Sequence, residues 1–282
     1  MVYEHEIPKG ARLYFAKEAR LKRRIEHIAS QELYANGFEE IVTPYFSYHQ
    51  HRFIENENDL IRLSDQKNRK LTMRADSTVD VVRLVTKRLG RSTEHKKWFY
   101  IQPVFRYPTS EYYQIGAEVL EGKQSIENLK IIARIFEALG ITPKLQLSNI
   151  KIPALLASEF GLGLDLFKNL DVDALLAQTP SWVERLLSIQ RAQEIEELFG
   201  IVPEAIEKEL IKLKELAEAI EYENLLIAPL FYAKMRYYKD LFFRFFENNV
   251  TLATGGDYEA EGLEASGFAL YTDELIAMIE KR

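Results

Sequence analysis

The sequence predicts an α+β fold, in which helices flank a mostly antiparallel sheet. Three patterns indicate it: an amphipathic run near the N-terminus, two strand-like runs joined by a short connection, and a later stretch rich in Leu, Ala, Glu and Lys. The short connection requires an antiparallel pair, because parallel strands need a crossover of a dozen or more residues. The chain has 282 residues, 47% of them hydrophobic, which is enough for a sizeable core.

The first part of the chain alternates between helical and extended patterns. Apolar residues recur at near-helical spacing over residues 17–34 and predict a helix that Asn36–Gly37 ends. Residues 38–48 and 70–74 are expected to be strands, the second of them led by a hairpin turn at Asn68–Arg69.

Helical spacing returns over residues 78–89, and two β-rich runs follow at residues 98–105 and 112–120. Ser125 is expected to cap a helix over residues 126–139, which Gly140 ends.

The second part of the chain begins with a predicted strand at residues 145–148 and then changes character. Gly and Pro punctuate short helical patterns over residues 153–221, and β-branched residues become scarce there. We therefore expect one domain over residues 1–282, with residues 153–221 as a helical insertion. Further strands are predicted at residues 226–232, 239–246, 250–253 and 268–271, with a closing helix from Thr272.

Two strand ends carry a recognisable motif. Phe105–Pro108 runs into Gln114–Glu118 across the short connection. This resembles the second signature motif of class II aminoacyl-tRNA synthetases, most closely that of the histidyl enzyme, in which an Arg ends one strand, a long basic loop grips ATP and a Gln-x-Gly-x-Glu strand returns. Here the connection is only residues 107–113, which contain no Arg. It is too short and too acidic to hold a triphosphate.

Other segments resemble the same family in the same order. Residues 36–44 are similar to the first motif, which builds the dimer interface, and residues 71–78 to the strand that carries an acid and a Thr toward the substrate amino group. Residues 235–243 resemble the histidyl enzyme's tyrosine-pair segment, and residues 254–258 its glycine-pair turn. In the third motif, residues 267–275, the ATP-binding Arg of the family is replaced by Glu274.

The resemblance implies a retained site for free histidine. Its ammonium, carboxylate and imidazole need an acid, a cation and an acceptor respectively. By family position, Asp76, Thr78 and Gln114 face the ammonium. Arg106 pairs with the carboxylate, and Glu118 binds the imidazole together with a Tyr. The implied histidine-binding residues are Asp76, Thr78, Arg106, Gln114, Glu118, Tyr237 and Tyr238.

Strand geometry agrees with part of this set. Gln114 and Glu118 are an even number of residues apart, so a strand places both on one face. Tyr237 and Tyr238 are adjacent, so only one of them can face the pocket. An alternative is that Arg106, Glu118 and Asp76 simply form a buried ion-pair network.

The resemblance implies a regulatory protein, since the two departures from the family pattern, the short connection at residues 107–113 and Glu274, both fall on nucleotide contacts. The resemblance is to the synthetase paralogues that serve as the non-catalytic regulatory subunit of ATP phosphoribosyltransferase, the first enzyme of histidine biosynthesis. Resemblance to these paralogues implies a short-form catalytic subunit as partner, histidine as feedback signal and a homodimer through the first-motif region. The alternatives are an amino-acid-activating histidyl-tRNA synthetase paralogue and a histidine sensor with another partner.

Composition argues against several other classes. A net charge of −6 weighs against a surface that must hold tRNA, and the anticodon-binding domain of a histidyl synthetase is not expected here. No stretch approaches the ~20 apolar residues of a membrane span, and a signal-peptide pattern is absent, so a cytoplasmic protein is expected. Without cysteine there is no disulfide or thiolate site. His49 and His51 lack partners at zinc-like spacing, and no nucleotide-binding fingerprint occurs, so neither metal nor cofactor is expected.

Overall fold

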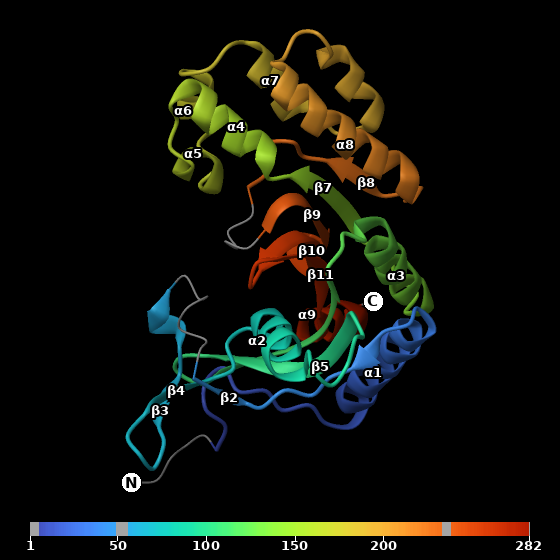
Figure 1. The fold of residues 1–282 in the computed structure, drawn as a ribbon. Coiled ribbons are helices and arrows are strands. Elements are labelled where there is room, and N and C mark those ends of the chain that lie inside the picture. Colours follow the sequence, from blue (N-terminus) through green and yellow to red (C-terminus); the bar gives the residue numbers. More distant parts are fainter. Residues whose placement is uncertain (1–5, 49–55, 233–237, 282) are drawn as a thin grey trace. The chain divides into compact units, whose positions relative to one another are not determined.

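A computed structural model of the chain describes residues 6–48, 56–232 and 238–281 (Figure 1). The chain divides into two compact units. Unit 1 comprises Met1–Gly122 and Ala260–Arg282, and unit 2 comprises Lys123–Glu259. The fold is α+β, as the sequence predicts. No helix in the described ranges is long and apolar enough to cross a membrane.

Unit 1 contains a sheet in which most neighbours are antiparallel. Its strands lie in the order β1 (Glu39–Glu40), β5 (Lys97–Arg106), β6 (Ser110–Leu120) and β11 (Leu263–Tyr271). Only β1 and β5 pair in parallel. A smaller antiparallel sheet has the order β2 (Phe46–Ser47), β4 (Lys70–Met73) and β3 (Arg62–Ser64).

Helices cover both faces of the larger sheet of unit 1. Phe99, on one face, is fully buried, and its ring meets that of Tyr34 edge-on at 4.9 Å between centroids. Tyr34 belongs to α1 (Ala16–Ala35), which contacts α9 (Thr272–Glu280) on this face. The alternate residues of β5 and β6 face α2 (Ser77–Leu84), which lies across these strands (Figure 1). Two short helical turns complete the unit, η2 (Glu57–Asp59) and the π-helical η3 (Val85–Leu89).

A buried arginine joins three segments of unit 1. Arg74 follows β4 and has no exposed surface. Its Nε and Nη2 donate to the carbonyl of Pro103 at 2.9 and 2.7 Å, and its Nη1 donates to the carbonyl and hydroxyl of Thr43 at 2.9 and 3.0 Å. The ring of Tyr45 lies 5.0 Å from the guanidinium carbon. These contacts fix the chain at residues 43–45 against β5.

Unit 2 has its own four strands, in the order β10 (Val250–Ala260), β9 (Tyr238–Glu247), β7 (Lys144–Asn149) and β8 (Leu225–Ile227). Phe243 and Phe245 of β9 are fully buried. Phe245 meets Phe136 of α3 and Tyr222, which follows α8, at 5.1 and 5.5 Å between ring centroids. The helices of this unit are α3 (Ser125–Ala138), α4 (Lys151–Phe160), α5 (Asp165–Lys168), α6 (Val172–Leu176), α7 (Trp182–Ser188), η4 (Ala192–Leu198) and α8 (Glu204–Ile220).

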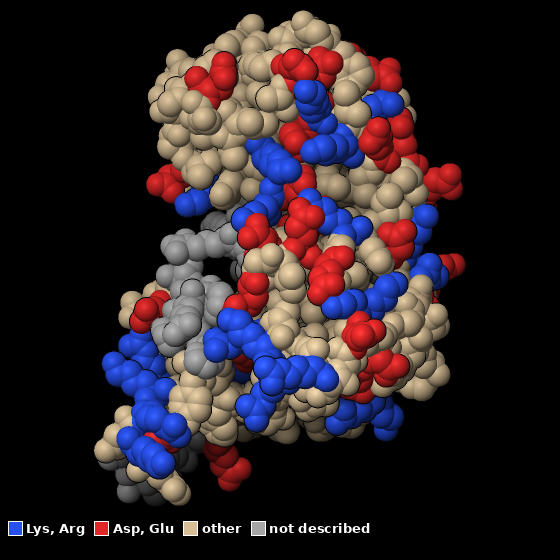
Figure 2. Space-filling view, viewed as in Figure 1, with Lys and Arg blue, Asp and Glu red and all other residues tan. Residues whose placement is uncertain are grey.

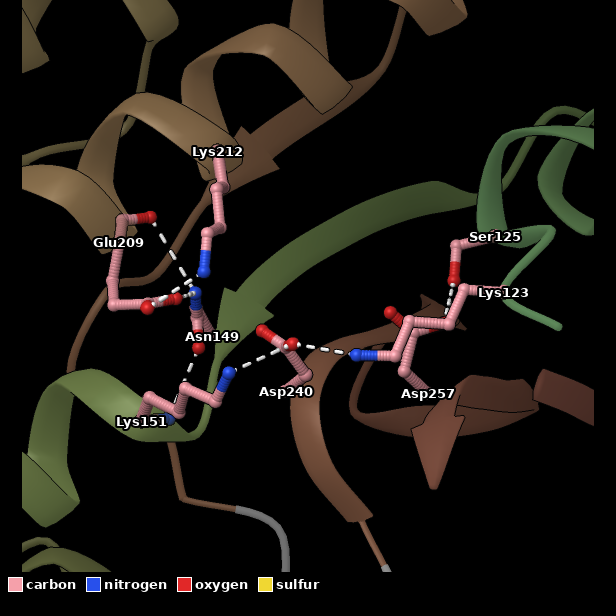
Figure 3. A network of polar contacts seen from close by, with 8 residues as sticks. All are labelled: Lys123, Ser125, Asn149, Lys151, Glu209, Lys212, Asp240 and Asp257. Carbon is pink, nitrogen blue, oxygen red and sulfur yellow. Dashed lines mark hydrogen bonds and ion pairs between the residues drawn. The ribbon is translucent and has the colours of Figure 1, made fainter. Parts of the chain in front are cut away.

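A carboxylate on β9 links three elements of unit 2. Asp240 is 7% exposed, and its Oδ2 receives Lys123 at 3.1 Å and Lys151 of α4 at 2.9 Å (Figure 3). Burial raises the pKa of Asp240, but the hydrogen bonds and charges of the two lysines outweigh it and hold the pKa below its usual value. The ion pairs therefore connect β9 to the start of α4 and to the segment before α3.

Several expectations from the sequence are correct. The helix over residues 17–34 is α1, the strands at 98–105 and 112–120 are the antiparallel pair β5 and β6, and the closing helix is α9. The helical elements α4 to α8 occupy the stretch predicted to be helical after residue 153.

Residues 38–48 are not one strand. They form only the two-residue strands β1 and β2, which belong to different sheets. The residues between them, including Pro44, take no part in a strand. The guanidinium of Arg74 donates to the carbonyls of Thr43 and Pro44, and the backbone N–H of Arg74 donates to that of Tyr45. The strand expected at residues 226–232 is also shorter, ending with Ile227.

Two local interpretations are wrong for a tertiary reason. Ser125 does not cap α3: Gln124 is the N-cap, and the Ser125 hydroxyl donates to Asp257 at 2.6 Å (Figure 3). Gly255–Gly256 is not a turn but lies inside β10, next to an irregularity in its pairing with β9. A Cβ at Gly256 would overlap the carbonyl oxygen of Leu241, so the close approach of the two strands requires glycine there.

We expect Arg74→Met to lower the free energy of unfolding by about 3 kcal/mol or more, because several buried carbonyls would lose their donor. Denaturant unfolding measures the change. Arg62→Met is the matched control, since Arg62 is an exposed arginine of β3 that forms an ion pair with Glu57. Equal midpoints for the two variants would contradict the role given to Arg74.

Asp240→Asn should reduce stability by about 1–3 kcal/mol at neutral pH, through loss of the charged hydrogen bonds. Because the pKa of the Asp240 carboxyl is lower in the folded state, its charged form stabilises the folded protein at pH values above the unfolded pKa of about 4. This stabilisation is lost as the pH falls through the folded pKa. The difference between parent and variant should therefore close below about pH 4. Asp165→Asn, at a carboxylate with 82% of its side chain exposed, is the control and should change little at either pH. A gap that stayed constant with pH would rule out the ion pairs as its source.

Candidate functional site

The predicted acid and its neighbours lie at the N-terminus of α2. Asp76 is the N-cap, and its Oδ1 accepts from the backbone N–H of Val79 at 3.0 Å. Burial raises the pKa of Asp76, and its bonds to the first turn of α2 and the charge of Arg106 partly oppose this. Arg106, the last residue of β5, donates through Nη1 to the carbonyl of Ala75. The Asp76 carboxylate and the Arg106 guanidinium therefore both bind backbone groups at the start of α2.

Tyr100 occupies the centre of the site. Its hydroxyl lies 3.3 Å from Thr78 Oγ1 and donates to Glu118 Oε1 at 3.2 Å. The Tyr100 side chain is fully buried and Glu118 is 1% exposed. Burial, and then the charges of Glu118 and Asp76, raises the pKa of Tyr100 well above its usual value. Tyr100 therefore stays protonated, its one proton goes to Glu118, and Thr78 donates to Tyr100 in turn.

Two glycines make room for this chain of hydrogen bonds. Gly116 pairs with Tyr100 across β5 and β6, and a Cβ there would overlap the Tyr100 ring. Gly267 of β11 pairs with Glu118, and a Cβ there would overlap Glu118 Oε2 and lie 2.6 Å from the carbonyl oxygen of Ala117. The positions of Tyr100 and Glu118 thus depend on bare backbone on the neighbouring strand.

The structure places the other predicted residues as follows. Gln114 is half-buried on β6, where the register pairs it with Gln102 and Tyr271. Tyr238 begins β9 in unit 2, is 9% exposed and meets Phe242 edge-on at 5.1 Å between ring centroids. Tyr237 lies outside the described residues.

The predicted residues of unit 1 lie on either side of the start of α2. Asp76, Thr78 and Glu118 gather around Tyr100. Arg106 donates through Nη1 to the backbone carbonyls of Ala75 and Phe105, and its charge acts on Asp76.

Sequence reasoning missed Tyr100. It lies in a run of aromatic and branched residues that predicts a strand, where nothing distinguishes it from the core. The antiparallel register of β5 and β6 could have identified it. Tyr100 lies opposite Gly116, and Glu118 lies two residues beyond Gly116 on the same face of the sheet.

A separate pocket of about 680 Å³ lies at the small sheet of unit 1, where Arg62, Leu63, Ser64, Lys70 and Leu71 contribute to its lining. Lysine and arginine side chains gather over this hairpin at the lower left of Figure 2. None of the predicted histidine-binding residues that the structure describes lines this pocket. The pocket is therefore distinct from the Tyr100 cluster, the group formed by Asp76, Thr78, Tyr100 and Glu118.

Comparison with known proteins identifies the fold. A family model described as histidyl-tRNA synthetase matches residues 10–275. A crystal structure described as an ATP phosphoribosyltransferase regulatory subunit/histidyl-tRNA synthetase from Bacillus halodurans superposes with a TM-score of 0.85, covering 99% of this chain and 84% of the other at 21% identity. The chain thus has the histidyl-tRNA synthetase-like architecture of class II synthetases.

Two relatives narrow the assignment. ATP phosphoribosyltransferase regulatory subunits from Wolinella succinogenes and Helicobacter hepaticus are 50% and 42% identical to this chain. The first match covers 99% of this chain and 97% of the relative, and the second covers 98% of each. The chain belongs to the family of ATP phosphoribosyltransferase regulatory subunits.

We expect Gly267→Ala to destabilise the protein by about 1–3 kcal/mol, the range for overpacking a filled core. The new methyl group would meet the backbone of Ala117 as well as the Glu118 carboxylate, and the backbone cannot turn away. Thermal unfolding gives the change. Gly122→Ala is the control, because a Cβ at Gly122 meets nothing within 4 Å. A variant at Gly267 as stable as the control would contradict the tight packing of Gly267 against Ala117 and Glu118.

Proposed function

We propose that this protein binds free histidine at the Tyr100 cluster and acts as the non-catalytic, histidine-sensing subunit of an ATP phosphoribosyltransferase. The observation that carries the proposal is the buried hydrogen-bond chain from Thr78 through Tyr100 to Glu118, beside Asp76 and Arg106. These bonds hold the buried Glu118 carboxylate in a fixed orientation.

The chemistry of these residues suits the three parts of histidine. The Asp76 carboxylate and Thr78 hydroxyl accept from the ammonium, and the Arg106 guanidinium binds the carboxylate through its planar fork. Glu118 accepts from an imidazole N–H, and the hydroxyl of Tyr100 holds one of its oxygens in place. Gln114 completes the part of the proposed set that lies in unit 1.

The nucleotide contacts of a synthetase are reduced in this chain, which supports a regulatory role over amino-acid activation. Strands β5 and β6 extend to Arg106 and Ser110, which pair with each other, so their connection is only Tyr107–Thr109. Glu274, in the first turn of α9, replaces the Arg of the family. A carboxylate there repels a triphosphate.

The assembly follows from the relatives' name and from the surface of unit 1. A regulatory subunit requires a separate catalytic subunit, which we propose as the partner. Val42, in the segment that resembles the first motif, is 78% exposed, and Tyr45 and Phe46, which follow this segment directly, are 52% and 56% exposed. We propose that a second copy of the chain covers them in a homodimer, because apolar side chains clustered at a surface favour association.

The proposal predicts that Glu118→Gln weakens histidine binding by about 1.5–3 kcal/mol, or roughly 10- to 150-fold, since a charged hydrogen bond is lost. Calorimetry on the isolated chain measures it. In the complex with a short-form catalytic subunit, the histidine concentration for half-inhibition should rise by a similar factor, with each complex compared with its own rate in the absence of histidine. Glu94→Gln, at an exposed glutamate, is the control.

Three results would contradict the proposal. Parental affinity in Glu118→Gln would place the histidine site elsewhere. Histidine binding without any effect of the chain on the catalytic subunit would favour a sensor with another partner. Histidine-dependent exchange of pyrophosphate into ATP by the isolated chain would restore the amino-acid-activating alternative.

A further inference from the structure

Arg244 of β9 is held rigidly in unit 2. Its Nε donates to Gln146 Oε1 at 2.9 Å, and Gln146, which is 3% exposed, donates in turn to Ser148 Oγ at 3.1 Å. The rings of Phe231 and Phe246 lie 4.9 and 4.7 Å from the guanidinium carbon. One hydrogen bond and two ring contacts therefore fix the orientation of the guanidinium.

The charge of this guanidinium is not balanced within the described residues. Burial lowers the pKa of Arg244, and no carboxylate of residues 6–48, 56–232 or 238–281 forms an ion pair with it. Arg74 provides the contrast, since all three of its nitrogens donate to oxygens of the chain. The Nη1 and Nη2 atoms of Arg244 make no hydrogen bond to described residues, so the outer edge of the fork is open to an anion.

Strand alternation places this open fork on an accessible side. Phe243 and Phe245 turn to the face of the unit 2 sheet that packs on α3, as the contact between Phe136 and Phe245 shows. Arg244 and Phe246 turn to the opposite face and remain partly exposed, as does Phe231. The exposed surface therefore combines one oriented cation with two half-exposed aromatic rings.

We propose that Arg244 is the anchor for an aspartate or glutamate side chain of the catalytic subunit. The planar fork matches the two oxygens of a carboxylate. A free small anion would leave the outer faces of Phe231 and Phe246 in water, whereas a protein surface covers the rings and the ion pair together. Arginine within an aromatic surround is typical of the residues that dominate binding energy in protein interfaces.

This inference rests on the proposed function, because it takes the catalytic subunit as the occupant. The test is the affinity of the full chain for that subunit, measured by analytical ultracentrifugation. Arg244→Glu should weaken the association about 30-fold or more, the level of an interface hot spot, because two carboxylates would then meet. Arg185→Glu, an exposed arginine of α7 in the same unit, has the same charge change and should bind as the parent does.

Arg244→Gln is a control for misfolding of Arg244→Glu, because it removes the charge and keeps a polar side chain. It should weaken association less than Arg244→Glu and leave circular dichroism unchanged. Parental affinity in a folded Arg244→Gln or Arg244→Glu variant would overturn the inference. A second contradicting outcome concerns free anions. If phosphate or acetate raised the melting temperature of the parent, and Arg244→Gln abolished that rise without affecting association, the occupant would be a free anion. A parent chain that fails to bind the catalytic subunit would instead refute the proposed function itself.

Discussion

The buried guanidinium of Arg74 is the contact on which unit 1 depends. Thr43 and Pro44 lie outside the strands, so their carbonyls have no partner in a strand ladder and would be left without a donor. Arg74 supplies that donor and at the same time binds the carbonyl of Pro103 on β5. Asp76 and Thr78 follow within four residues along the chain. The arginine that secures an irregular segment therefore also sets where the candidate site begins.

The candidate site is fixed by strand register as much as by its polar groups. Tyr100 and Glu118 occupy their positions because Gly116 and Gly267 leave space on the adjacent strands. A shift of one residue in either pairing would turn every side chain to the opposite face and replace the glycines with larger residues. The sheet and the hydrogen-bond chain thus specify each other, and neither can be altered alone.

Local patterns were sufficient to predict α1, β5, β6 and α9, because hydrophobic periodicity and a short connection determine such elements directly. These local patterns failed where a residue distant in the sequence determines the local structure. Ser125 bonds Asp257 instead of capping α3, and Gly256 accommodates a close strand instead of a turn. In the site, Asp76, Thr78 and Glu118 were expected from the family resemblance. Tyr100 was not, since its importance arises only when the register sets it opposite Gly116.

The discontinuity of unit 1 has a consequence for its biosynthesis. Strand β11 pairs with β6 along seven residue pairs, from Ala265 with Leu120 to Tyr271 with Gln114, yet the whole of unit 2 is translated between them. While the ribosome makes unit 2, β6 keeps an unpaired edge, with Glu118 and its neighbours lacking their final partner strand. This pairing of distant segments is slow to form, because a long loop must close before it is stabilised. Nascent chains thus pass through a period in which β6 lacks β11 and an open strand edge favours association with other chains.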